Sequence, residues 1–71
     1  MSNEQLIARY PNVRNKLIDA RRARGLPQYK AALLLNISWP YYSLIELGEV
    51  TPYPELAARI TKLTGYEWEE T

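Results

Sequence analysis

The sequence predicts an all-helical fold in which four to five short helices surround one compact core. Apolar residues recur at intervals of three and four along most of the chain, which is the period of an amphipathic helix. Glycine, proline and asparagine separate these stretches, as expected where helices begin and end. No stretch alternates apolar and polar residues as a half-buried strand does, and 71 residues suffice for a single small domain.

The first predicted element is a short leading helix over residues 2–9. Ser2 and Gln5 have the spacing of a weak capping box, in which each end of the motif satisfies a backbone amide at the start of a helix. Pro11 interrupts this helix, because proline lacks an amide hydrogen. Residues 1–12 are therefore expected to form an N-terminal helical extension.

Two further helices follow on either side of a glycine. Asn12 is expected to cap a helix over residues 13–24, and Gly25 ends it by adopting a left-handed conformation. Pro27 suits the first turn of the next helix, over residues 27–35, since the amide that proline lacks has no partner there. The apolar residues expected to pack along this helix are Ala31, Ala32, Leu34 and Leu35.

The next helix, over residues 39–47, is bounded by strong local signals. Asn36 tolerates the left-handed conformation of a tight turn, and Ser38 is a good N-cap. Pro40 lies inside the first turn, where proline is tolerated, and Gly48 ends the helix.

The last predicted helix covers residues 54–63 and is ended by Gly65. Residues 13–66 are expected to form the folded domain, and residues 67–71 a C-terminal tail. This tail is too short for another stable helix unless Trp68 packs against the body.

The composition excludes several classes of function. Cysteine and histidine are absent, which removes disulfides, thiolate chemistry and most zinc sites, and only one aspartate is present. We therefore expect no catalytic site, no cofactor and no metal. No apolar run is long enough to span a membrane, and the N-terminus lacks a secretory signal, so a cytoplasmic protein is expected.

The charge is unevenly distributed although its net value is only +1. Residues 1–30 hold seven Lys/Arg and two acidic residues, a net +5, whereas residues 31–71 hold two Lys/Arg and six acidic residues, a net −4. A basic half of this kind is typical of a nucleic-acid surface, and equally of a solvated helix face. The basic strip consists of Arg14, Lys16, Arg22, Arg24 and Lys30.

Residues 28–46 have the pattern of two short helices joined by a tight turn. A small residue allows the helices to cross closely, an asparagine makes the turn, and apolar residues fill the angle between them. These positions are Ala32, Asn36, Ile37, Tyr42 and Ile45.

On these residues the chain resembles the phage-repressor-type (XRE/Cro-like) helix-turn-helix family, whose fold is the lambda-repressor-like domain. The resemblance extends over about residues 13–66 and includes Arg21-x3-Gly25-Leu26-Pro27-Gln28, Ile37-Ser38-x2-Tyr41-x3-Ile45-Glu46-x-Gly48, Pro52-x2-Glu55 and Leu63-Thr64-Gly65.

The resemblance implies roles for four residues. It implies that Arg21 and Glu46 form a partly buried ion pair. It also implies that Gln28 and the amide groups beside it bind a phosphate of double-stranded DNA, and that Ser38 caps a recognition helix directed at the major groove.

The recognition helix nevertheless departs from the family pattern. Base edges are recognised by side chains that donate or accept hydrogen bonds. Of Trp39, Pro40, Ser43 and Leu44, only the serine is polar. Glu49 stands in the following loop, where a cation is expected against phosphates. The helix is apolar on its outer side as well, through Trp39, Pro40, Leu44 and Leu47, which is typical of a protein interface.

Two functions therefore remain open. The first is a small phage- or prophage-type transcriptional regulator that binds DNA in a genetic switch, as a homodimer. The second is an antirepressor or modulator that binds a partner repressor through the apolar outer face. A third reading of that face is that the N-terminal segment or Trp68 covers it. The face expected to contact DNA or a partner consists of Gln28, Tyr29, Ser38, Trp39, Pro40, Tyr41, Ser43, Leu44 and Leu47.

Overall fold

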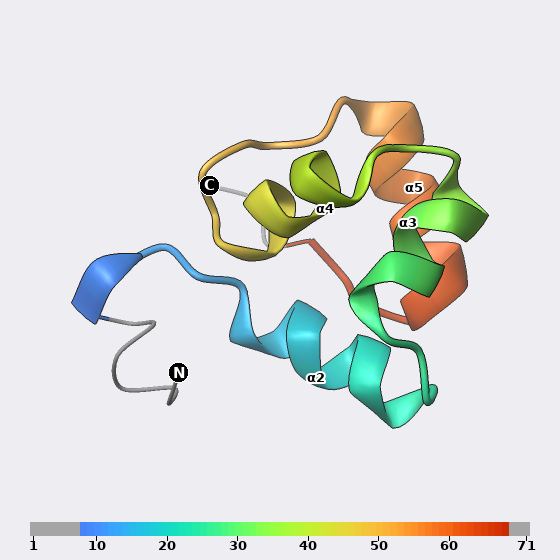
Figure 1. Ribbon diagram of the computed structural model, residues 1–71, viewed down its shortest axis with the longest axis horizontal. Coiled ribbons are helices and arrows are strands. Elements are labelled where there is room, and N and C mark those ends of the chain that lie inside the picture. Colours follow the sequence, from blue (N-terminus) through green and yellow to red (C-terminus); the bar gives the residue numbers. More distant parts are fainter. Residues whose placement is uncertain (1–7, 69–71) are drawn as a thin grey trace.

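The computed structural model describes residues 8–68, and these form an all-α domain. Its helices are α2 (Asn15–Ala23), α3 (Gln28–Leu35), α4 (Trp39–Glu46) and α5 (Pro54–Thr64) (Figure 1). No residue between 8 and 68 lies in a strand. The predicted all-helical fold class is therefore confirmed. Within the same range, no helix has the length and apolar character needed to cross a membrane.

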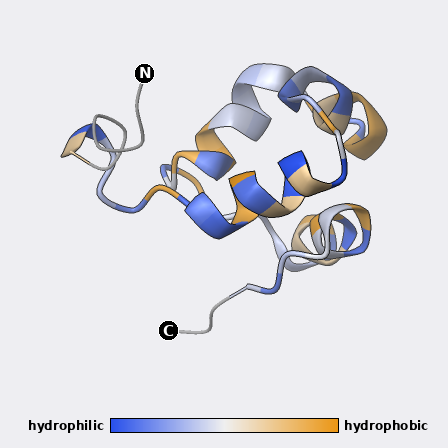
Figure 2. Cartoon of the chain, turned by 90° about the horizontal axis from the view of Figure 1, so that it is seen from below, coloured by the Kyte–Doolittle hydropathy of each residue, from blue (hydrophilic) through white to orange (hydrophobic). Residues whose placement is uncertain are grey.

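The core lies where the four helices meet. α3 packs against α4, α2 packs against α5 and α4, and α5 also packs against α3. Hydrophilic and hydrophobic segments alternate along α2 (Figure 2), because Leu17 and Ile18 face the core while Asp19 and Arg22 are exposed. The buried core cluster comprises Leu17, Ala31, Ala32, Leu35, Tyr42, Ile45, Leu56, Ile60 and Tyr66.

The turns follow the local sequence closely. Gly25, Asn36 and Gly65 have φ angles of 67°, 59° and 83°, so each adopts the left-handed conformation predicted for the residue that ends a helix. The Ser38 side chain accepts a hydrogen bond from the Tyr41 backbone N–H at 3.2 Å, as an N-cap does. These four predictions are confirmed.

The start of the second predicted helix was wrong. α2 begins at Asn15 rather than at residue 13, its N-cap position is Arg14, and no side chain caps it. The tertiary structure gives the reason, since the Arg14 backbone N–H donates to the Glu46 carbonyl at 2.8 Å and so holds the chain against α4 before the helix begins. Of the predicted leading helix, Ala8 and Arg9 are helical, and the remainder lies outside the described residues.

The predicted packing of α3 was wrong at one position. Ala31, Ala32 and Leu35 are buried, but Leu34 is 53% exposed and its neighbour Leu33 is 73% exposed. Five consecutive apolar residues surround the helix on all sides, and the body of the protein covers only one of those sides. Periodicity could not identify the exposed side.

Trp68 packs against the body, although not over the outer side of α4. Its indole N–H donates to the Ala57 carbonyl at 2.9 Å, and its ring meets Tyr66 edge to face at 4.8 Å between centroids. The Arg14 guanidinium lies 5.1 Å from the centre of the same ring. Trp68 therefore does not cover the apolar residues of α4.

Among the glycines described, Gly48 lies closest to another part of the backbone, at Asn12. Substitution by alanine tests this close approach. Its φ is 78°, and a Cβ there would lie 2.0 Å from the Asn12 carbonyl oxygen. Gly48→Ala is expected to lower the free energy of unfolding by about 3 kcal/mol or more, because left-handed strain and a backbone clash add together. Urea unfolding followed by circular dichroism measures this.

Gly25→Ala is the matched control. Gly25 also has a positive φ, of 67°, but nothing lies within 4 Å of the position of a Cβ. Only the conformational cost of about 1 kcal/mol should remain. Equal losses in the two variants would contradict the close approach.

Candidate functional site

A buried ion pair joins α2 to α4 at the centre of the molecule. The Arg21 Nε donates to Glu46 Oε2 at 2.6 Å, and its Nη2 donates to Glu46 Oε1 at 3.2 Å. Arg21 is 5% exposed and Glu46 1% exposed. The Arg21 Nη1 also donates to the Leu26 carbonyl at 2.7 Å, which secures the turn before α3. Both charged groups are thus paired and hydrogen-bonded, as buried charges must be.

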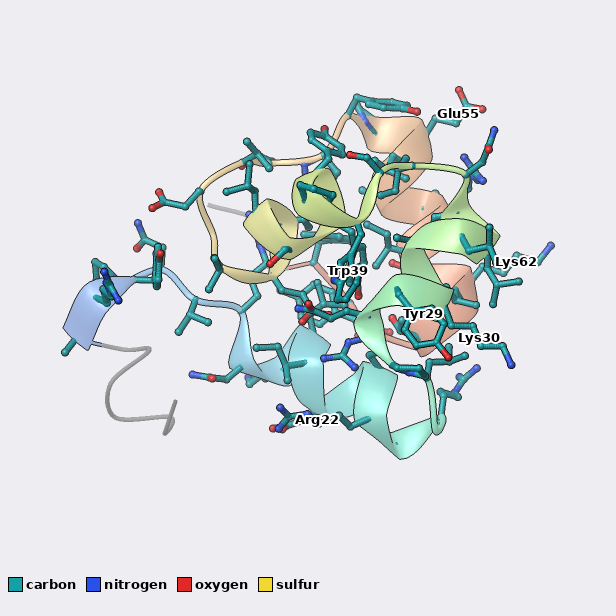
Figure 3. The ribbon with its side chains drawn as sticks, viewed as in Figure 1. Arg22, Tyr29, Lys30, Trp39, Glu55 and Lys62 are labelled. Atoms are coloured by element: carbon teal, nitrogen blue, oxygen red, sulfur yellow. The ribbon has the colours of Figure 1, made fainter. Side chains whose placement is uncertain are left out.

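The ion pair extends to the surface through α3. Gln28 Nε2 donates to Glu46 Oε1 at 2.8 Å, and Gln28 Oε1 accepts from the Trp39 indole N–H at 3.1 Å. The Trp39 ring in turn contacts Tyr29, with 6.1 Å between centroids and a tilt of 58°. Figure 3 shows Trp39 and Tyr29 side by side, between α4 and α3. The first residues of α3 and α4 are therefore joined by their side chains.

Two ionisable groups in this network have shifted pKa values. Burial lowers the pKa of Arg21, but the hydrogen bonds and the charge of Glu46 outweigh it, and the pKa is raised above its ordinary value. Burial raises the pKa of Tyr42, and the Glu46 carboxylate acts in the same direction. Arg21 therefore stays charged and Tyr42 neutral, and the Tyr42 hydroxyl is buried without a hydrogen-bond partner.

The amino end of α3 favours an anion. No side chain caps α3, whose N-cap position is Pro27, so its first amide groups are not satisfied by a cap. Its third residue, Lys30, is exposed. The amino end of a helix carries a partial positive charge and favours anions, and a lysine beside it adds to this preference.

One face of α4 is turned to solvent and is mostly apolar. Trp39 is 54% exposed and Leu44 is 40% exposed. Pro40 is exposed between them in sequence, and Ser43 and Leu47 are half-buried. These five positions fall on one side of a helix with 3.6 residues per turn.

Three residues of the predicted contact face make contacts within the chain. Tyr41 is half-buried and packs against the core cluster. Ser38 caps α4 from an exposed position. Gln28 is half-buried, with both ends of its amide bonded within the chain. The structure thus joins Gln28, Tyr29 and Trp39 through side-chain contacts, whereas Tyr41 packs against the core.

The structure does not gather the predicted basic strip into one patch. Arg14 is half-buried, and its Nη1 donates to the carbonyls of Ile45 and Val50. Arg24 Nη1 donates to the Leu63 carbonyl at 3.2 Å, at the end of α5. Arg22 and Lys16 are exposed on α2, and Figure 3 shows Arg22 well apart from Tyr29 and Lys30. Among the five residues of the strip, only Lys30 adjoins Gln28 and Tyr29, at the amino end of α3.

Sequence reasoning missed three features of this surface. Leu33 and Leu34 are exposed on α3, and Arg59 Nη2 donates to the Leu35 carbonyl at 2.7 Å, at the carboxyl end of the same helix. The spacing of Tyr29 and Leu33, one helical turn apart, was the available signal for an outward side of α3. Nothing local marked Arg59, because its acceptor is 24 residues away.

Comparison with protein families identifies the family of the chain. A family model described as Helix-turn-helix matches residues 17–70, which is most of the chain. The family is one of DNA-binding transcriptional regulators and is not an enzyme family. No curated protein and no solved structure matches the chain.

Replacement of Glu46 tests how much the stability of the fold depends on the buried ion pair. Glu46→Ala is expected to lower the free energy of unfolding by about 3 kcal/mol, because Arg21 is left buried without its counter-ion. Chemical denaturation measures the loss. Glu49→Ala removes an exposed carboxylate three residues away and should change stability by no more than about 0.5 kcal/mol. A Glu46→Ala loss as small as that of the control would contradict the role assigned to the pair.

Proposed function

We propose that this chain, which belongs to the helix-turn-helix family of DNA-binding transcriptional regulators, is a small phage- or prophage-type regulator that binds operator DNA in a genetic switch. α4 is the recognition helix and enters the major groove, and α3 lies across the phosphate backbone. Two copies bind as a homodimer, since a two-fold symmetric protein fits a palindromic operator. The resemblance to phage-repressor-type regulators supports this setting, and a cytoplasmic location goes with it.

The observation that carries this proposal is the junction of the two helix amino ends. Gln28 and Trp39 are the first residues of α3 and α4 and are hydrogen-bonded to each other at 3.1 Å. Both helices therefore direct their amino ends to the same corner, where Lys30 adds a positive charge and no side chain caps α3. A DNA backbone at this corner receives α3 amide groups and the Lys30 ammonium on its phosphates.

Reversing the charge of Lys30 tests this docking. Lys30→Glu is expected to weaken binding to the promoter region upstream of the chain's own gene about tenfold, and to reduce the slope of log affinity against log salt by about 1, since a phosphate contact is lost. Gel shifts between ~50 and ~200 mM salt measure both quantities.

Arg9→Glu is the matched control for net charge. Arg9 is exposed and belongs to the short segment before α2, drawn in blue in Figure 1, which lies away from α3. It should retain most of the affinity and the original salt slope. If the unmodified protein fails to shift the promoter duplex at ~50 mM salt, DNA binding at this operator is refuted.

The second candidate function is that of an antirepressor or modulator that binds a partner repressor. The observation that favours it is the apolar solvent-facing side of α4, with Trp39 54% and Leu44 40% exposed. Glu49 is exposed in the loop directly after this helix, and a carboxylate there repels phosphates. Exposed aromatic and aliphatic side chains are the usual anchors of protein interfaces.

Leu44→Arg separates the two functions because it acts on them in opposite directions. An arginine should reduce binding to a partner repressor at least about 30-fold, since an apolar anchor typically contributes about 2 kcal/mol or more. On a duplex that lacks the operator, the added cation should preserve or strengthen DNA binding, because this binding is electrostatic and independent of sequence. Co-purification from a host carrying the neighbouring genes and gel shifts give the two readouts.

Leu33→Arg is the control for this experiment. It introduces the same cation on α3, at a position that is 73% exposed and outside the α4 face. It should leave partner capture unchanged. Retained partner capture in Leu44→Arg would contradict the assignment of the α4 face to a partner repressor.

A further inference from the structure

The solvent-facing side of α4 offers very few hydrogen-bonding groups. Of its five side chains, Trp39, Pro40, Leu44 and Leu47 are apolar, and Ser43 has a single hydroxyl. The remaining donor, the indole N–H of Trp39, is already bonded to Gln28 Oε1 at 3.1 Å. Such a surface cannot distinguish one DNA sequence from another mainly through hydrogen bonds.

The Trp39 ring is held in one orientation by the rest of the structure. Its N–H is satisfied by Gln28, whose other end is fixed by the buried Glu46 at 2.8 Å. Tyr29 supports the ring from α3. Because its one polar atom has an internal partner, the ring can press against an apolar group without leaving a donor unsatisfied. Little conformational freedom remains to be lost on binding.

The major groove presents one apolar group on its base edges, the C5-methyl group of thymine. We propose that the α4 face selects its operator through these methyl groups, with Trp39 and Leu44 as the specificity-determining residues. This inference rests on the proposed DNA-binding function and names the chemistry that the recognition helix selects. The operator is accordingly rich in A·T pairs at the positions opposite Trp39 and Leu44, and its binding depends on the methyl groups as such.

Deoxyuridine provides a direct test, because it differs from thymidine only by that methyl group and keeps every hydrogen-bonding group of the base pair. The full chain is first used to select binding sites from a pool of random-sequence duplexes. The enriched duplex is then synthesised with deoxyuridine in place of thymidine at one position at a time, and the dissociation constant of each duplex is measured. Burial of one methyl-sized group corresponds to about a fourfold change in affinity, so loss of about fourfold is expected at each contacted thymine.

Protein variants assign each methyl contact to a side chain. Leu44→Ala and Trp39→Ala should each abolish the thymidine–deoxyuridine difference at one position or more while the other positions keep theirs. Leu33→Ala removes a leucine that is 73% exposed on α3 and outside the α4 face, and it should leave every ratio unchanged. Circular dichroism shows whether each variant is folded.

The outcomes separate this inference from the function on which it rests. Enrichment of duplexes whose affinity is the same with deoxyuridine as with thymidine overturns methyl recognition and leaves DNA binding intact. Enriched sites without thymine at the contacted positions do the same. Failure of the pool to enrich any sequence overturns sequence-selective DNA binding and this inference together.

Discussion

The structure depends on the buried pair of Arg21 and Glu46, because it joins α2, α3 and α4 at one point. Arg21 belongs to α2, Glu46 ends α4, and Gln28 opens α3 and bonds the same carboxylate. A buried ion pair contributes little net stability compared with an apolar pair of similar shape, since desolvation offsets the attraction. Its value here is geometric: the carboxylate accepts bonds from two directions and so fixes how α3 and α4 lie relative to α2.

Three other arginines also form hydrogen bonds within the protein. Arg14, Arg24 and Arg59 donate to backbone carbonyls at or after the carboxyl ends of α4, α5 and α3 respectively. Carbonyls at these ends have no partner within their own helix, and a cation there also favours the helix dipole. Several arginines therefore bond to groups of the protein itself. For this reason, the net charge of +5 over residues 1–30 does not form a single basic surface.

The parts of the fold that could be predicted are those determined by neighbours in sequence. Asn36 and Gly65 mark helix ends because few residues tolerate a left-handed backbone, and Ser38 caps α4 through a bond to a residue three positions on. The start of α2 and the exposure of Leu34 could not be predicted in this way. The first depends on a backbone bond between Arg14 and Glu46, and the second on which side of α3 the other helices cover.

By itself, the sequence determined the order of the helices, most of their turns and the family, because each depends on local conformational preferences and on the spacing of apolar residues. It also determined that the solvent-facing side of α4 is short of hydrogen-bonding groups. The tertiary structure alone decided that Gln28 and Trp39 bond to each other and that Arg14 is turned inward. These contacts join residues separated by 11 and 36 positions. Such contacts arise only once the helices have packed, since nothing in either residue's own neighbourhood specifies its partner.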